Sequence, residues 1–220
     1  MEQTINLKML LLGGLIAVGA AISCSTANAG TEKLVVAGGC FWCVESDFES
    51  VPGVKKAVSG FTGGTAANPT YKQVTKGGSG HYEAVEITFD NSKVSRDKLL
   101  HLFFRSVDPT DAGGQFCDRG DSYRTAVFYM NDAQKAAAEA AKTKAQKDLG
   151  KTIVTPVLAA GKFFKADASH QDYYKGTKVV LTRFGPKKKS DAYQRYRKAC
   201  GRDARVKQLW GSDAPFADKY

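Results

Sequence analysis

Two cysteines, Cys40 and Cys43, stand where a short apolar run ends in a Gly-Gly pair and a segment with helical spacing begins. Cys40 falls at the predicted N-terminus of that helix, where unpaired backbone N–H groups and the helix dipole stabilise a negative charge. A thiol in such a position can have a pKa below the usual value of about 8.5 and be a thiolate near neutral pH. The pattern therefore indicates a nucleophilic or redox-active thiol at Cys40.

Two large aromatic residues, Phe41 and Trp42, separate the cysteines. Consecutive aromatic residues can pack into a core, or they can form the wall of a pocket for an apolar group beside a nucleophile. The Cys-x-x-Cys pair is also compatible with a structural disulfide or with half of a zinc site. A four-ligand zinc site needs a second such pair, which the sequence lacks. We therefore predict no metal and no organic cofactor.

Two polar loops supply groups that could act together with a thiol. Glu83 stands just before a predicted strand, beside His81 and Tyr82, where a raised pKa would let its carboxyl serve as an acid. Asp118 and Tyr123 offer a second acid and a phenol. For Asp118 alone, ordinary turn formation is the better explanation.

Hydrophobic periodicity predicts the elements that position these residues. We predict strands at 34–37, 54–60, 85–89, 125–130 and 153–159, and helices at 41–50, 95–107, 133–149 and 190–210, the last broken near Gly201. Residues 62–80 and 110–122 are expected to be long loops, and Pro156 places the last strand at a sheet edge. The order β-α-β-β-α-β followed by a further helix and strand predicts an α+β fold, a ferredoxin-like α/β sandwich.

The N-terminal 29 residues have the features of a signal peptide. An apolar stretch at 9–22 is too short to span a bilayer comfortably and precedes a small-x-small site, so we predict cleavage before Gly30 and export to the periplasm. The alternative is a lipoprotein anchored at Cys24. Cleavage leaves four cysteines, too few for a disulfide scaffold, in a compartment where disulfides persist.

Positive charge is concentrated near the C-terminus. The 220 residues carry a formal net charge of +10, and the segment from Arg183 to Lys207 contains ten basic residues and two acidic ones. Such a block can bind nucleic acid or a membrane surface, but charge runs alone specify little, and we interpret it as a solvated basic tail. We expect no nucleic-acid partner.

Five motifs in a fixed order, between about residues 33 and 183, closely resemble the A-type peptide methionine sulfoxide reductases. They are Gly39-Cys40-Phe41-Trp42, Gly60-Phe61-Thr62-Gly63-Gly64, Asn68-Pro69-Thr70-Tyr71, Gly80-His81-Tyr82-Glu83-Ala84-Val85 and Asp118-Arg119-Gly120-Asp121-Ser122-Tyr123-Arg124. The resemblance implies reduction of methionine S-sulfoxide, free or in oxidised proteins that are thereby repaired. Together with the predicted signal peptide and the basic segment, the resemblance divides the chain into a signal peptide (1–29), a catalytic domain (30–185) and a basic C-terminal extension (186–220).

The resemblance also implies roles for individual residues. Cys40 would be the nucleophile, and Glu83 the acid that protonates the sulfoxide oxygen. The other implied residues bind substrate: Phe41 and Trp42 hold the S-methyl group, and Tyr71, Asp118 and Tyr123 complete a hydrogen-bonded pocket. Attack on sulfur would leave a sulfenic acid on Cys40, which a second thiol converts to an intramolecular disulfide.

The resolving cysteine is left open by the sequence. Cys200 ranks slightly ahead of Cys43 because many family members resolve through cysteines near the C-terminus, and Cys117 ranks third. An external thioredoxin-like protein would reduce the disulfide, and we expect a monomer.

Two other function classes remain as alternatives. A general thiol–disulfide oxidoreductase would need only Cys40 and Cys43. A basic binding protein would use Arg183–Lys207 and would be indifferent to Cys40.

Overall fold

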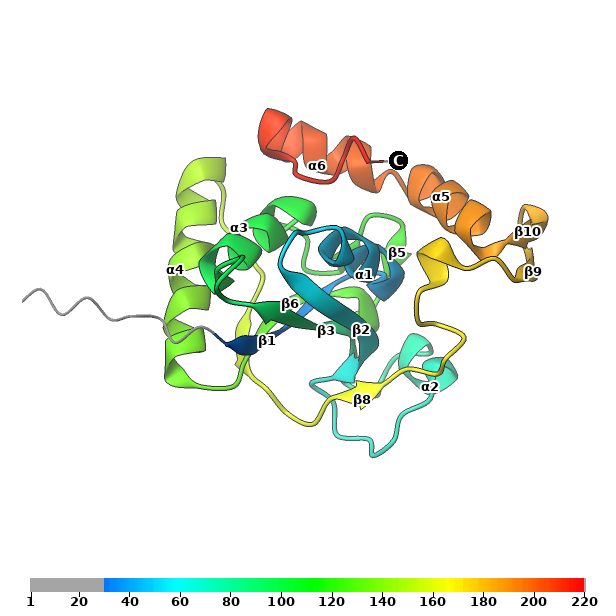
Figure 1. Ribbon diagram of the computed structural model, residues 1–220, viewed down its shortest axis with the longest axis horizontal. Helices are drawn as coiled ribbons and strands as arrows, with labels where there is room; N and C mark the ends of the chain where they lie inside the picture. Colours follow the sequence, from blue (N-terminus) through cyan, green and yellow to red (C-terminus); the bar gives the residue numbers. More distant parts are fainter. Residues whose placement is uncertain (1–29, 220) are drawn as a thin grey trace, which may run out of the picture.

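A six-stranded sheet with strand order β7-β6-β1-β3-β2-β8 runs through the centre of the protein (Figure 1). The computed structural model describes residues 30–219. The sheet strands are β1 (Thr31–Gly38), β2 (Val54–Thr62), β3 (Tyr82–Asp90), β6 (Thr125–Tyr129), β7 (Val157–Ala159) and β8 (Phe164–Lys165). Neighbouring strands are antiparallel except β6 and β7, which are parallel. Two small two-stranded sheets lie outside it: β4 (Gly114–Gln115) with β5 (Asp118–Arg119), and β9 (Val179–Thr182) with β10 (Gly185–Lys188).

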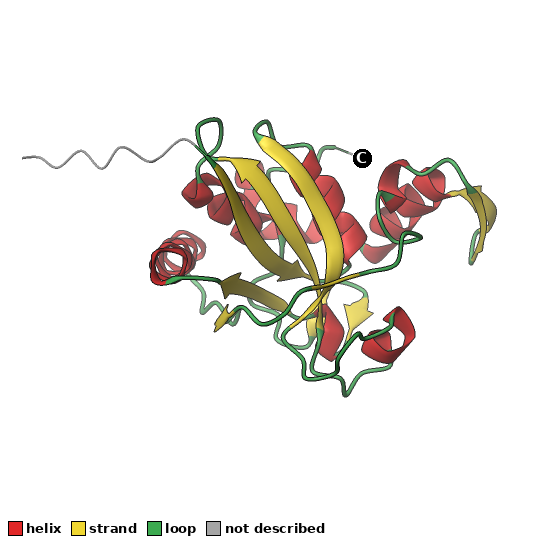
Figure 2. Ribbon diagram, turned by 60° about the horizontal axis from the view of Figure 1, so that its bottom comes forward, coloured by secondary structure: helices red, strands yellow, loops and turns green. Residues whose placement is uncertain are grey.

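The described part of the chain contains six α-helices, most of which lie on one side of the sheet (Figure 2). They are α1 (Phe41–Glu49), α2 (Tyr71–Thr75), α3 (Arg96–Ser106), α4 (Asp132–Leu149), α5 (Lys189–Cys200) and α6 (Arg202–Trp210); short 3-10 turns are η1 (Asp121–Tyr123), η2 (Tyr173–Lys175) and η3 (Gly211–Asp213). None of these helices is long and apolar enough to cross a membrane.

Both faces of the central strand β1 are buried, which explains its uninterrupted apolar run. Leu34 and Val36 point into the main core, which α1 and α3 cover. Val35 and Ala37 point to the opposite face, where a smaller cluster includes side chains from the segment 158–163. The side chains that alternate along β1 thus contribute to two cores, one on each face of the sheet. The mixed α/β fold predicted from the sequence is confirmed.

The predicted elements lie close to their observed positions, and the differences concern short elements. Ser95 caps α3 and Asn131 caps α4, which ends at the left-handed Gly150. The expected loop 62–80 contains α2, which begins with a capping box between Thr70 and Gln73. The strand predicted at 153–159 is shorter than expected, since β7 covers only its last three residues, and it lies at a sheet edge as expected. It is not the last strand, because β8 and the hairpin β9–β10 follow it. Strands of two to four residues carry too little periodicity to predict.

The turn between β1 and α1 depends on Gly39. Its φ is +79°, a conformation that favours glycine, and an added Cβ would lie 2.6 Å from the Cβ of Gln115. Gln115 in turn accepts from the backbone N–H of Asp108 and donates to its carbonyl, both at 2.8 Å. Close packing at this glycine therefore brings the 110–122 loop against the start of α1.

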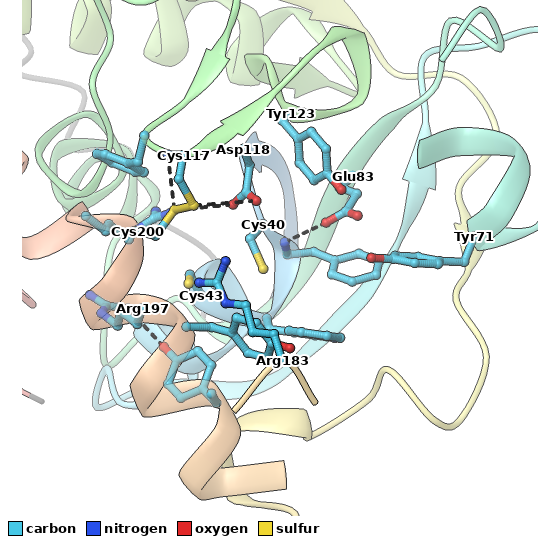
Figure 3. Close-up of a pocket in the computed structure, with 16 residues that line it drawn as sticks. Cys40, Cys43, Tyr71, Glu83, Cys117, Asp118, Tyr123, Arg183, Arg197 and Cys200 are labelled. Carbon is cyan, nitrogen blue, oxygen red and sulfur yellow. Dashed lines mark hydrogen bonds between the residues drawn. A yellow bond between two sulfur atoms is a disulfide. The ribbon is translucent and has the colours of Figure 1, made fainter. Parts of the chain in front are cut away.

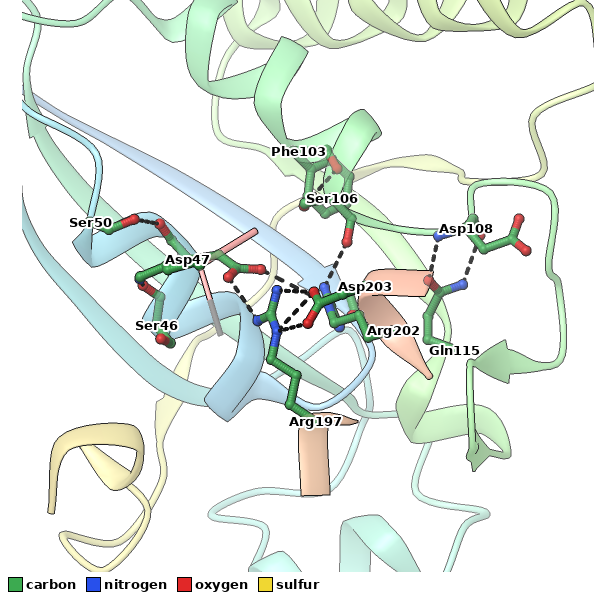
Figure 4. Close-up of polar contacts among 12 residues, drawn as sticks. Ser46, Asp47, Ser50, Phe103, Ser106, Asp108, Gln115, Arg197, Arg202 and Asp203 are labelled. Atoms are coloured by element: carbon green, nitrogen blue, oxygen red, sulfur yellow. Dashed lines mark hydrogen bonds and ion pairs between the residues drawn. The ribbon is translucent and has the colours of Figure 1, made fainter. Parts of the chain in front are cut away.

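The C-terminal helices are attached to the core by two buried arginines (Figure 4). Arg197 is 2% exposed and donates to Asp47 of α1 at 2.8 Å and to Asp203 at 2.7 Å. Arg202, also 2% exposed, donates to the carbonyls of Gly38 and Ser106 at 3.1 and 3.0 Å. The interpretation of this segment as a solvated tail is wrong for these two residues, because each meets a buried acceptor that lies far away in the sequence.

We predict that Arg197→Leu lowers the free energy of unfolding by about 3–5 kcal/mol, since it removes the hydrogen-bonded partner of the buried Asp47 and leaves it with Arg202 at 3.9 Å. Urea unfolding followed by circular dichroism measures the difference. Arg195→Leu, at an exposed position of the same helix, is the matched control and should change stability by less than about 0.5 kcal/mol. Equal effects in the two variants would contradict the proposed anchoring.

Candidate active site

A cavity of about 300 Å³ opens at the N-terminus of α1 (Figure 3). Its walls come from α1, the start of β3, the loop around β5, the tip of the β9–β10 hairpin and helices α5 and α6. All ten candidate residues from the sequence line it: Cys40, Phe41, Trp42, Cys43, Tyr71, Glu83, Cys117, Asp118, Tyr123 and Cys200. The fold therefore gathers into one place side chains that are up to 160 residues apart.

Cys40 and Cys43 are free thiols joined by a hydrogen bond. Cys40 is the N-cap of α1, and its carbonyl accepts from the backbone N–H of Cys43 at 3.0 Å. The hydrogen bond from Cys40 and the positive charges of Arg202 and Arg197 lower the pKa of Cys43 to about 7. The same hydrogen bond, together with burial, raises the pKa of Cys40. The expectation of a lowered pKa at Cys40 is therefore wrong for the resting pair, because the hydrogen bond between the two thiols, with smaller contributions from Arg202 and Arg197, stabilises the first negative charge on Cys43.

Glu83 is a buried carboxyl, 1% exposed, next to the thiol pair. Its Oε2 accepts from the backbone N–H of Phe41 at 3.0 Å, whereas Oε1 has no hydrogen-bond partner among residues 30–219. Burial is the main cause that raises the pKa of Glu83 to about 8, and the nearby Asp118 and Cys43 add to it. At neutral pH Glu83 thus carries a proton beside the cavity.

Two phenols and a second carboxyl surround the same space. Burial raises the pKa of both Tyr71 and Tyr123, so both remain neutral donors. Burial also raises the pKa of Asp118, while the charges of Arg202 and Arg183 oppose this effect. Together with Glu83 these groups can hold and protonate a polar oxygen.

An aromatic wall closes one side of the cavity. Trp42 stacks on Tyr173, with ring centroids 3.7 Å apart, and His170 stacks on Tyr71 at 4.3 Å. His170 also contacts Phe41, at 5.5 Å between centroids. The segment that carries His170 and Tyr173 was not expected at the site, and no periodicity or spacing in the sequence marks it.

Cys117 and Cys200 form a disulfide in the cavity wall. Among the described residues, two groups of three side chains have potential metal-ligand atoms within 4.8 Å of one another. Cys117, Asp118 and Cys200 form the first group. The other is Glu45, Glu49 and Asp172. The sulfurs of the first group are bonded to each other, and Lys175 pairs with Glu49 and Asp172 in the second. Neither group offers an open set of metal donors.

Comparison with known proteins agrees with this chemistry. The family model described as peptide methionine sulfoxide reductase matches residues 32–212. Peptide methionine sulfoxide reductase MsrA 2 of Caulobacter vibrioides is 48% identical over 204 residues, covering 92% of this chain and 97% of that protein. The chain belongs to the peptide methionine sulfoxide reductase family.

Other members of the peptide methionine sulfoxide reductase family support the same assignment. Peptide methionine sulfoxide reductase MsrA of Bacillus subtilis is 47% identical over 183 residues, covering 82% of this chain and 97% of that protein. The solved structure of methionine sulfoxide reductase A of Corynebacterium diphtheriae superposes with a TM-score of 0.63 at 28% identity, covering 72% of this chain and 84% of that one. The resemblance seen in the five motifs is thereby confirmed.

We predict that one thiolate forms with a midpoint near pH 7 when the protein is titrated with its Cys117–Cys200 disulfide intact, since Cys43 loses its proton first. Thiolate absorbance at 240 nm follows the titration. Cys43→Ser should remove the step near pH 7. A step that persists unchanged in this variant would assign the low pKa to Cys40 instead.

Proposed function

We infer that this protein reduces methionine S-sulfoxide, free or in oxidised proteins, to methionine, and so repairs oxidised proteins. One observation carries the inference: a buried, protonated Glu83 with an unpartnered oxygen lies in one cavity with a thiol pair that ionises near pH 7. A sulfoxide oxygen leaves sulfur only when it is protonated. The reaction therefore needs a thiolate and a neutral acid at the same pH, which this environment provides.

The first step transfers the sulfoxide oxygen to Cys40. As the Cys40 sulfur attacks the sulfoxide sulfur, its proton passes along the hydrogen bond to the Cys43 thiolate. Glu83 donates its proton to the sulfoxide oxygen, and Tyr71 and Tyr123 stabilise that oxygen with hydrogen bonds. Methionine leaves, and the oxygen remains on Cys40 as a sulfenic acid.

The apolar end of the substrate would lie against the aromatic wall. The Trp42 ring is fixed by its stacking on Tyr173, and the Phe41 ring by its contacts with His170 and Phe61. Rigid aromatic faces suit an S-methyl group, because they exclude water and offer polarisable surface. This arrangement would place the sulfoxide sulfur at Cys40 and its oxygen toward Glu83.

Cys43 is our choice for the resolving thiol, ahead of Cys200 and Cys117. It already contacts Cys40 through a hydrogen bond, whereas Cys200 is bonded to Cys117. Attack of the Cys43 sulfur on the sulfenic acid expels water and forms a Cys40–Cys43 disulfide. Two electrons from an external dithiol, of the thioredoxin type, then restore both thiols.

The N-terminal and C-terminal segments complete the proposal. We propose that residues 1–29, which lie outside the described residues, direct export to the periplasm and are removed before Gly30; a lipid anchor at Cys24 is the alternative. Residues 30–185 and 186–220 would act as one monomeric unit, since the second segment supplies Arg197, Cys200 and Arg202 to the cavity. The antiparallel core order β6-β1-β3-β2 supports a ferredoxin-like description.

We predict that Glu83→Gln slows the single-turnover formation of methionine by ~10²–10⁴-fold, because the amide cannot donate the proton as an acid does. In the unsubstituted protein the rate should rise through pH 7 as Cys43 ionises and fall above pH 8 as Glu83 loses its proton. The fall should be absent in the variant. Glu86→Gln, on the same strand but paired with Lys33 at the surface, is the control. Unchanged rates in Glu83→Gln would remove Glu83 from the mechanism.

We predict that Cys43→Ser transfers the oxygen more slowly, because it lacks the thiolate that takes the Cys40 proton, and that it then accumulates the Cys40 sulfenic acid. Dimedone labelling and mass spectrometry detect this species. Cys200→Ser should still lose the two thiols at Cys40 and Cys43 in one turnover. If instead Cys200→Ser accumulates the sulfenic acid and Cys43→Ser forms a disulfide, Cys200 is the resolving residue.

A general thiol–disulfide oxidoreductase is the alternative function, because Cys40 and Cys43 form a dithiol with one low pKa. Such an enzyme would leave the buried acid and the aromatic wall without a role. It would retain full activity in Glu83→Gln.

A further inference from the structure

Three arginines line the cavity, and one of them has no acidic partner. Arg197 is paired with Asp47 and Asp203, and Arg202 is paired with Asp47 and also donates to two backbone carbonyls. Arg183, in contrast, forms no ion pair with any acid in residues 30–219 and is exposed to solvent. Its charge is therefore available to an anion that enters the cavity.

The position of Arg183 is fixed by the hairpin that carries it. Arg183 and Phe184 form the turn between β9 and β10, and the Oγ1 of Thr182 closes this turn by accepting from the Phe184 N–H at 3.0 Å and donating to the Gly185 carbonyl at 2.7 Å. The guanidinium lies over the rings of Phe184 and Tyr196, 4.9 and 4.8 Å from their centroids. Contact with ring faces holds the guanidinium plane and leaves its N–H groups free for hydrogen bonds.

The Arg183 side chain lines the same cavity as the reacting groups. Arg183 lines the cavity together with Cys40, and its charge lowers the pKa of Asp118, which borders that cavity (Figure 3). A methionine side chain is short, so a substrate whose sulfur reaches Cys40 keeps its backbone near the rim of the cavity. Because Arg183 lines this cavity and is exposed to solvent, a group attached to that backbone can approach it.

We propose that Arg183 is a carboxylate-binding residue that selects substrates with an anionic group next to the methionine sulfoxide. The planar guanidinium matches a carboxylate with two parallel hydrogen bonds. That carboxylate is the α-carboxylate of free or C-terminal methionine sulfoxide, or the side chain of a neighbouring Asp or Glu. This inference rests on the proposed function and specifies its substrate class.

Steady-state kinetics of the full protein with four substrates test the proposal. They are free methionine S-sulfoxide, N-acetyl-methionine S-sulfoxide, its uncharged amide, and the N-acetyl dipeptide amide in which Glu follows the sulfoxide. Arg183→Gln should raise the KM of the anionic substrates by about tenfold or more, the range for hydrogen bonds to charged groups, and leave kcat unchanged. The KM of the uncharged amide should stay within about twofold.

The design separates the possible sources of the carboxylate and the possible failures. A rise in KM confined to the first two substrates assigns the site to the α-carboxylate. A rise in KM confined to the dipeptide assigns it to a neighbouring acidic side chain. Lys187→Gln removes the same charge from the same hairpin outside this cavity and should change none of the four KM values. Equal effects of Arg183→Gln on charged and uncharged substrates, or no effect, would overturn the proposal. Failure of the unsubstituted protein to reduce all four would instead overturn the proposed function.

Discussion

The hydrogen bond between the Phe41 N–H and the Glu83 carboxyl holds the two halves of the site together. It joins the first residue of α1 to the second residue of β3 and fixes an acid beside the helix N-terminus that carries Cys40. Because the bond uses only one carboxyl oxygen, the other is left to carry the proton. Burial keeps this proton in place at neutral pH, so the same constraint fixes both the position of the acid and its protonation state.

The remaining structure supports this arrangement from two sides. The segment with His170 and Tyr173 packs behind the aromatic residues of α1 and determines the orientation of Trp42. From the other side, α5 and α6 bring Arg197 and Arg202 next to Cys43. A buried carboxyl with a raised pKa and a buried thiol with a lowered pKa can coexist within one cavity because each has its own neighbours. The hydrogen bond from Cys40, together with the arginines, lowers the pKa of the Cys43 thiol, and burial raises that of the Glu83 carboxyl.

The sequence predicted the fold class and ten of the residues that line the cavity, for different reasons. Strong periodicity located α3, α4 and the central strands, while the Gly-Gly-Cys junction and the ordered motifs identified Cys40 and Glu83. The ionisation of the thiol pair could not be predicted, since it depends on the hydrogen bond between the two thiols and on Arg202, which α6 holds against the carbonyls of Gly38 and Ser106. Nothing in the sequence distinguished Arg183 from the other basic residues between Arg183 and Lys207. Its special position becomes visible only in the structure, where it lies in the turn between β9 and β10.

The central claim is that the cavity combines an acid with a thiol pair to take oxygen from a methionine sulfoxide. Its most direct test is a single turnover without external reductant, using the protein with Cys40 and Cys43 reduced and either the S or the R epimer of methionine sulfoxide. If this claim holds, the S epimer alone yields one methionine per protein, with the loss of two thiols. No methionine from either epimer would contradict it and would favour a dithiol oxidoreductase.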